Sequence, residues 1–247
     1  MYFKGDRVHN IGTISEEKIE MKIRWLGHSC FLISGKDKVL IDPYLSGNPA
    51  APLKPIEVDC DIICVTHGHS DHIGDAVEIA KRTKAPIVAL FEVASYVSQW
   101  TESIGMNIGG TTRVKGTTIK MVSAVHSSGI PGSEFKHSGG VAAGFVIACN
   151  NEKKVYHAGD TALFQDMKTI GEVDRPDVAL LPIGDLYTMG PKDAALAVSW
   201  INPHIVIPMH YNTWPKVQQD PDEFKKLVET KTGSKVIILK IGEEIEL

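Results

Sequence analysis

The sequence predicts one α/β domain in which two β-sheets pack face to face and helices cover the outer faces. Short apolar runs of strand length alternate with helical stretches along the whole chain. The second half also repeats the first in outline, because each half holds a hairpin that ends in an aspartate and a later buried strand that ends in a histidine. A chain of 247 residues is an ordinary length for a single domain of this class. Together these observations favour a pseudo-symmetric two-sheet sandwich.

The composition is that of a globular protein with a full core. Hydrophobic residues make up 43% of the chain and charged residues 23%, and the net charge of −4 shows no basic excess for nucleic acid. No apolar run approaches the roughly 18 residues of a membrane helix, and the N-terminus lacks an apolar signal segment. The four cysteines form no C-x-x-C pair, which fits a reducing compartment. We therefore expect a cytoplasmic protein with a small-molecule substrate and neither a membrane nor a nucleic-acid partner, and we leave a homo-oligomer open.

The first half is predicted to begin after an accessory arm, residues 1–20, with the main domain spanning 21–247. Gly27-His28 breaks the first strand, and a Gly-containing turn at 34–37 between two apolar runs indicates a hairpin. Three glycines between 109 and 116 indicate a series of turns. The predicted strands are 22–26, 30–33, 38–41, 62–65, 86–90 and 118–122, and the predicted helices are 75–84 and 92–100.

The second half holds two helices whose ends are marked by proline. Pro191 and Pro221 suit the first turn of a helix, and Pro203 and Gly233 lie just beyond the helix ends. The predicted helices are 191–200 and 220–232. The predicted strands are 144–148, 154–157, 178–181, 204–209 and a final strand at 236–239.

One stretch, Thr66-His67-Gly68-His69-Ser70-Asp71-His72, brings four potential metal ligands within six positions. It directly follows the buried strand 62–65, so these side chains lie on a loop at a strand's carboxyl end. Imidazole and carboxylate together suit Zn, Mn, Fe or Ni, and no thiolate is offered. A solvated loop that happens to be rich in histidine is the alternative, and the strand-end context disfavours it.

Three further candidates, His126, Asp160 and His210, each follow a predicted strand. A lone histidine at a strand end is more often a structural hydrogen-bonding group than a ligand. Five histidines and two aspartates at strand ends, however, are what two adjacent metal ions need. We assign one metal to His67, His69 and His126 and the other to Asp71, His72 and His210. Asp160 would bridge, because a carboxylate has two oxygens to share.

On these residues the sequence resembles the metallo-β-lactamase superfamily, through His67-x-His69-x-Asp71-His72 followed in order by the three later candidates. More narrowly, it is similar to uncharacterised metal-dependent hydrolases related to L-ascorbate-6-phosphate lactonase, in the stretches 27–29, 66–75, 156–161 and 210–213. The resemblance covers 21–247. It implies an αββα four-layer sandwich of two mixed sheets, with helices on the outer faces and the metals at one sheet edge.

Other candidates surround this set. We expect Asp42 to accept a hydrogen bond from a ligand histidine and thereby fix its tautomer, a turn cap before Pro43 being the alternative. His28 is expected to reach the same cleft, with a hydrogen bond in the core as an equal alternative. His157 and His137 are expected to be structural and solvated, respectively. Candidate walls of a substrate pocket, with ordinary packing as the alternative, are Asp185, Tyr187, Met189 and Trp214.

Two metals that share a hydroxide predict hydrolysis. We expect a dinuclear metal-dependent hydrolase that cleaves a small ester, lactone or phosphoester by attack of a metal-bridging hydroxide. Asp160 and Asp71 are the expected catalytic residues, and the cofactors are two divalent ions per chain, Zn or Mn before Ni or Fe. The alternative is a phosphodiesterase or ribonuclease of the same fold. An iron redox enzyme is disfavoured by His69, where such sites use a carboxylate, and a non-enzymatic metal protein is disfavoured because no ligand is missing.

Overall fold

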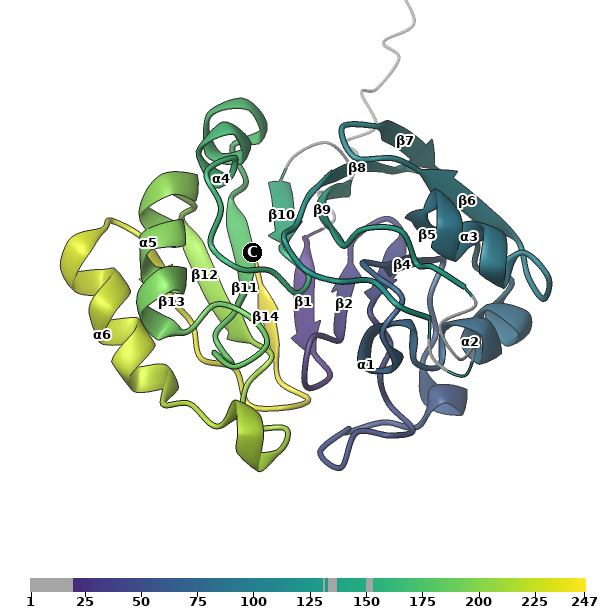
Figure 1. Ribbon diagram of the computed structural model, residues 1–247, viewed down its shortest axis with the longest axis horizontal. Coiled ribbons are helices and arrows are strands. Elements are labelled where there is room, and N and C mark those ends of the chain that lie inside the picture. Colours follow the sequence, from purple (N-terminus) through teal and green to yellow (C-terminus); the bar gives the residue numbers. More distant parts are fainter. Residues whose placement is uncertain (1–19, 131, 133–136, 150–152) are drawn as a thin grey trace, which may run out of the picture.

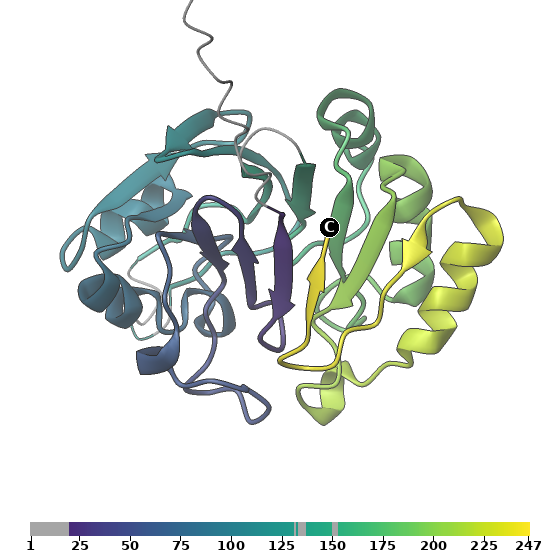
Figure 2. The same cartoon turned by 180° about the vertical axis from the view of Figure 1, so that it is seen from behind.

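The structure is a computed structural model that describes residues 20–130, 132, 137–149 and 153–247. Two seven-stranded sheets face one another through the middle of the molecule (Figures 1 and 2). The predicted accessory arm lies outside the described residues except for Glu20. The predicted class, an α/β sandwich of two mixed sheets, is confirmed.

The first sheet is built from the N-terminal half of the chain and one strand from its far end. Its order is β14-β1-β2-β3-β4-β5-β6. Neighbours are antiparallel from β14 to β3 and parallel from β3 to β6. The strands are β1 (Lys22–Trp25), β2 (Phe31–Ser34), β3 (Lys38–Ile41), β4 (Ile62–Val65), β5 (Ile87–Leu90), β6 (Ser103–Met106) and β14 (Glu244–Glu246).

The second sheet repeats this arrangement. Its order is β13-β12-β11-β10-β9-β8-β7, antiparallel from β7 to β10 and parallel from β10 to β13. The repeat predicted from the sequence is therefore present as a repeated strand topology. The strands are β7 (Thr111–Val114), β8 (Thr117–Ser123), β9 (Ala143–Cys149), β10 (Lys153–His157), β11 (Val178–Pro182), β12 (Ile205–Met209) and β13 (Lys235–Val236).

Helices cover the outer side of each sheet. In Figure 1, α2 (Ala76–Thr83) and α3 (Phe91–Val97) flank the first sheet, whereas α5 (Pro191–Ile201) and α6 (Pro221–Lys231) flank the second. No helix of the described chain is long and apolar enough to cross a membrane. Shorter elements are η1 (Pro55–Glu57), α1 (Ser70–Ile73), α4 (Met167–Thr169), the π-helical turn η2 (Ile170–Asp174) and η3 (Pro215–Val217).

The core has two layers because the central strands are covered on both faces. Alternate side chains of a strand point to opposite faces, so Ile62 and Cys64 of β4 join the cluster between the sheets. Ile63 and Val65 point the other way and pack with Ile79 of α2. Every residue of β4 is buried as a result, which explains why this strand appears in the sequence as an unbroken apolar run.

The sequence-based prediction of the elements was wrong in several places. It assigned turns to the stretch 109–116, which contains β7, and it predicted no element where β6 lies, because β6 contains Gly105 and is only partly buried. The predicted helix 92–100 ends at Val97, and the helical turns at 167–174 were not predicted. The predicted final strand 236–239 is paired only at Lys235 and Val236. The last strand is instead β14, which pairs with β1 across more than two hundred residues, as in Ile23↔Ile245.

Tyr156 offers a test of this core. Its ring is fully buried, and its hydroxyl has no hydrogen-bond partner among the described residues. Leaving a buried polar group unpaired costs about 1–3 kcal/mol. We therefore expect Tyr156→Phe to raise the free energy of unfolding by about 1 kcal/mol or more, measured by urea denaturation. Tyr211→Phe, whose hydroxyl is not among the buried unpaired atoms, is the control, and a loss of stability in Tyr156→Phe alone would contradict the prediction.

Candidate metal centre

All the candidate ligands lie at one edge of the sandwich, where strands end. Because β8, β10 and β12 run in the same direction, their carboxyl ends share an edge of the second sheet. His126, Asp160 and His210 follow these three strands. The edges of the two sheets are joined there, since the Ala143 amide donates to the Thr66 carbonyl and the His210 amide to the His28 carbonyl.

The first group of candidates lies on the loop after β4 and the segment after β8. His67 Nε2 is 3.0 Å from His69 Nδ1. The ring of His126 lies 5.2 Å from that of His67 and 5.1 Å from that of His69, between centroids. One nitrogen from each of the three lies within 4.8 Å of the others. The structure therefore brings together the three residues assigned to one metal.

The second group contains Asp71 and His72 on α1, His210 after β12, and His28 in the turn after β1. Their ligand atoms also lie within 4.8 Å of one another. His28 is buried, and its Nε2 is 3.2 Å from Asp71 Oδ2. The structure places His28 beside the second group, buried and hydrogen-bonded to Asp71.

Asp160 lies where the two groups meet. Its Oδ2 is 3.0 Å from His210 Nε2 and 3.2 Å from His72 Nε2, both of the second group. The same oxygen is 3.7 Å from Nε2 of His126, which belongs to the first group. One buried carboxylate therefore approaches imidazoles delivered by both sheets.

Asp42 fixes the orientation of two imidazoles. Its carboxylate accepts hydrogen bonds from the Thr66 amide (2.8 Å), the Thr66 hydroxyl (2.7 Å) and His72 Nδ1 (2.7 Å). Because the Thr66 hydroxyl donates its proton to Asp42, it accepts from His67 Nδ1, 3.0 Å away. The Nε2 atoms of His67 and His72 are thus the ones turned toward the cluster.

His28 holds Asp71 in the same manner. Burial and the neighbouring His210 lower the pKa of His28 to about 4, so the ring is neutral near pH 7. A carboxylate cannot donate, so His28 Nε2–H donates to Asp71, and His28 Nδ1 accepts from the Thr213 hydroxyl at 2.8 Å. These hydrogen bonds fix Oδ2 of Asp71, which is also 4.0 Å from His72 Nε2.

The electrostatics and the unpaired atoms fit a divalent cation. Burial, reinforced by His72, holds the pKa of His67 well below its usual value, so its nitrogen is in the ligand form. Burial opposes charge on Asp160 too, but His210 and His72 outweigh it and hold the carboxyl pKa well below its usual value. Within the described chain, the buried atoms His72 Nε2 and Asp160 Oδ1 have no hydrogen-bond partner. Imidazole nitrogens and carboxylate oxygens are the ligand atoms that Zn, Mn, Fe and Ni accept in proteins.

Backbone strain is concentrated at this edge. His28, Asp42 and His210 have φ angles of 53°, 45° and 55°, in the left-handed region that L residues rarely adopt. Asp42 and His210 directly follow a strand, and His28 lies three residues after the end of β1. The chain turns sharply at each of them, and such strain is typical of functional sites.

The candidate pocket walls divide into three cases. The ring of Trp214 lies 4.8 Å from His28 and 6.4 Å from Tyr44, beside the second group. Asp185 and Tyr187 are exposed on the loop after β11. Met189 is buried in the main core cluster, which is the packing alternative that the sequence left open.

Several residues of this edge were not identified from the sequence. They are Thr66, Thr213, Tyr44 and Ser127, whose hydroxyl is 3.3 Å from His69 Nε2. Thr66 and Thr213 flank the histidine motifs, and that adjacency was the one available signal. His157 is buried and links Ser29 O to the Gly159 amide, a structural role. His137 contacts the ring of Tyr96.

The chain is similar to known metal-dependent hydrolases over most of its length. A model of the beta-lactamase superfamily domain matches residues 22–210, which contain every candidate ligand. A UPF0173 metal-dependent hydrolase of Methanosarcina barkeri is 53% identical over 230 residues, 93% of this chain and 100% of that protein. One from Archaeoglobus fulgidus is 52% identical, covering 92% of this chain and 99% of that protein. The solved structure of a metallo hydrolase from Ignicoccus hospitalis superposes with a TM-score of 0.84 at 38% identity, covering 92% and 98%.

The role of Asp42 can be tested by Asp42→Asn. The amide keeps the size of the side chain but places an NH₂ group against donors, so the tautomers of His67 and His72 are no longer fixed. Loss of such a partner typically weakens metal binding about 10–100-fold, and we expect that range for zinc in a chelator competition assay. A serine in place of the exposed Asp59 is the control. Unchanged zinc affinity in Asp42→Asn would contradict this role.

Metal binding should release a proton from His72. Burial lowers the pKa of this imidazole, but Asp160 and Asp42 outweigh burial and hold it well above its usual value. The metal-free ring is therefore charged at pH 7, whereas a ligand nitrogen must be unprotonated. We expect calorimetric zinc titrations in buffers of different ionisation enthalpy to show about one proton released per chain, and zinc affinity to fall as the pH falls. Zinc binding without proton release would contradict this.

Proposed function

Because the chain belongs to the β-lactamase superfamily and, within it, to the UPF0173 metal-dependent hydrolases, we propose that it hydrolyses a small ester, lactone or phosphoester with two divalent metal ions. The observation that carries the proposal is the position of Asp160, whose Oδ2 is 3.0–3.7 Å from imidazoles of both groups. A carboxylate with two oxygens in that place suits two neighbouring cations.

The ligand sets follow from the two groups. His67, His69 and His126 would hold one ion, and Asp71, His72 and His210 the other, with Asp160 shared between them. Zinc and manganese are the first choices, ahead of nickel and iron, since imidazole and carboxylate suit all four. When bound, two such ions supply a water of lowered pKa and positive charge beside the oxygen on which negative charge develops.

The side chains of the centre then have separate tasks. Asp160, whose Oδ1 has no other described partner, accepts the proton of the attacking water. Asp71, held at Oδ2 by His28, keeps its second oxygen in a fixed direction. Asp42 and Thr66 keep His67 and His72 oriented and do not touch the substrate. Preorganised groups of this kind do not have to rearrange during the reaction.

The substrate approaches from the side of the centre on which Asp71 is partly exposed. The side chain of Asp71 is 24% exposed, whereas those of His72 and His210 are almost fully buried. The aromatic rings of Tyr44 and Trp214 stand beside this opening, in contact with His28. A small molecule can reach Asp71 there without disturbing the buried ligands.

The ligand assignment is tested by His67→Ala and Asp71→Ala. Each removes a candidate metal ligand, so we expect hydrolysis to fall about a hundredfold to a thousandfold in both, because a lost charge-stabilising group commonly costs 10²–10³ in kcat. His204→Ala, at an exposed residue directly before β12, is the control. Activity close to the wild type in either variant would overturn the assignment.

The substrate class is tested with protein stripped by a chelator and reloaded separately with zinc and with manganese. Turnover of a γ-lactone and not of bis(4-nitrophenyl) phosphate supports a small-metabolite hydrolase. The reverse result would promote the alternative, a phosphodiesterase or ribonuclease of the same fold. If protein with two metals bound turns over neither substrate and no simple ester, the result would count against hydrolysis.

A further inference from the structure

We propose that an apolar groove behind the metal-binding loop, here called the α1–α3 groove, receives an aryl or acyl group of the substrate. The inference rests on the proposed function and names the class of substrate, a hydrolysable molecule with an apolar substituent. The groove has a volume of about 370 Å³. Its lining residues are Ser70, Ile73, Gly74, Val77, Lys81, Tyr96, Trp100 and Ile130.

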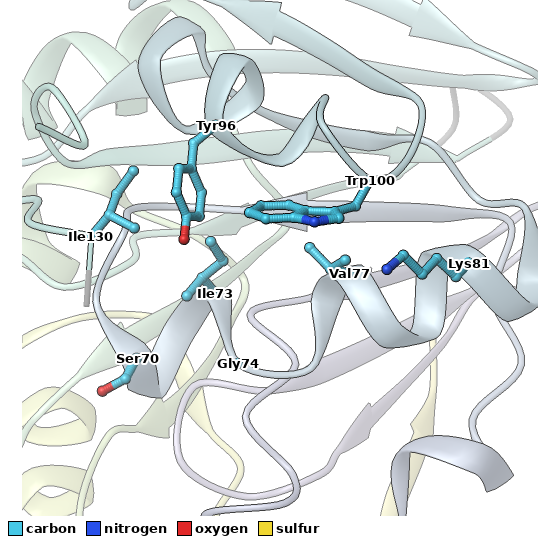
Figure 3. Close-up of a pocket in the computed structure, with 8 residues that line it drawn as sticks. All are labelled: Ser70, Ile73, Gly74, Val77, Lys81, Tyr96, Trp100 and Ile130. Atoms are coloured by element: carbon cyan, nitrogen blue, oxygen red, sulfur yellow. The ribbon is translucent and has the colours of Figure 1, made fainter. Parts of the chain in front are cut away.

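The walls of the groove are aromatic and aliphatic. Tyr96 and Trp100 come from α3 and the turn that follows it, with ring centroids 5.1 Å apart in an edge-to-face arrangement. Figure 3 shows the indole of Trp100 lying over Val77, while the hydroxyl end of Tyr96 points toward Ile73. Trp100 is 44% exposed, a large apolar surface to leave in water.

The groove and the metal centre share the short helix α1. Residues three apart in a helix lie on one face, so Ser70 and Ile73 face the groove while Asp71 and His72 face the metals. On the loop side, a Cβ on Gly68 would lie 3.0 Å from Ile130 Cγ1, so the wall of the groove touches the backbone between His67 and His69. The inference is that a substrate whose reacting bond lies at the metals extends its substituent around α1, past Ser70, into the groove.

Size and polarity restrict what the groove accepts. A dry cavity of about 150 Å³ holds benzene, so 370 Å³ accommodates a group of one or two rings or a medium acyl chain. In the described chain the hydroxyls of Ser70 and Tyr96 make no hydrogen bond, and they can orient an oxygen of the substituent. Few polar groups on apolar walls are typical of a small-molecule site.

The inference is tested first by binding, without any requirement for turnover. We would titrate zinc-loaded protein with 4-phenylbutanoate and with acetate, which share a carboxylate for the metals and differ in the apolar group. We expect 4-phenylbutanoate to bind about tenfold or more tightly, and Trp100→Ala to remove most of that difference, since apolar pocket contacts contribute 10–200-fold. Val77→Phe, which fills the groove, should act in the same direction.

The control is Phe91→Ala, an exposed aromatic on the same helix that does not line the groove. Equal affinity for the two acids, no measurable binding of 4-phenylbutanoate, or no effect of Trp100→Ala and Val77→Phe would overturn the inference. A dimer that Trp100→Ala converts to a monomer in gel filtration would also overturn it, because a second copy would then cover the groove.

A kinetic experiment separates this inference from the proposed function. We expect the ratio of kcat/KM for γ-nonalactone over γ-butyrolactone to fall about tenfold in Trp100→Ala. If both lactones are turned over and the kcat/KM ratio is the same in wild type and variant, the groove is not a substrate site, while the proposed hydrolase activity stands. If the protein binds 4-phenylbutanoate more tightly than acetate but turns over no ester, lactone or phosphoester, the proposed hydrolysis is wrong, while the inference about the groove stands.

Discussion

The buried carboxylate of Asp42 is the constraint on which the centre depends. It accepts three hydrogen bonds, two from Thr66 and one from His72, and can donate none. Its position is itself fixed by the parallel pairing of β3 with β4, since the Asp42 amide donates to the Cys64 carbonyl. The strand register therefore decides the tautomer of these histidines. The direction of the hydrogen bonds sets which nitrogen of His67 and of His72 faces the candidate metal centre.

The centre also depends on the pairing of two similar halves. The strands of the first sheet deliver the histidine motif, and those of the second deliver His126, Asp160 and His210. Backbone hydrogen bonds close the edge, from His210 to His28 and from Ala143 to Thr66. Neither half carries a full set of ligands, so the chemistry belongs to the junction between the sheets and not to either repeat.

The sequence predicted the features that depend on residues close together in the chain, and it missed those that depend on residues far apart. The motif from His67 to His72 is local, and a strand-loop-helix pattern places its side chains almost without tertiary information. Asp160 could be placed at the same edge from the strand pattern, but its distance to His72, which the first sheet delivers, depends on how the sheets meet. Thr213 and Ser127 act through contacts with residues 185 and 58 positions away. The sequence contains no periodic signal for such pairs. Strand β14 was not predicted for the same reason, because its partner β1 lies at the other end of the domain.

The return of the chain from the second sheet to the first has a consequence for synthesis on the ribosome. Strand β1 is made near the start, yet its outer edge is covered only when β14, at residues 244–246, has left the exit tunnel. An uncovered edge strand can pair with other chains, so the nascent N-terminal half has a period of exposure that lasts until β14 has been made. His210 is the last of the candidate ligands along the chain, and it is made before β14. The set of candidate ligands is therefore complete while the edge of β1 is still open to pairing with other chains.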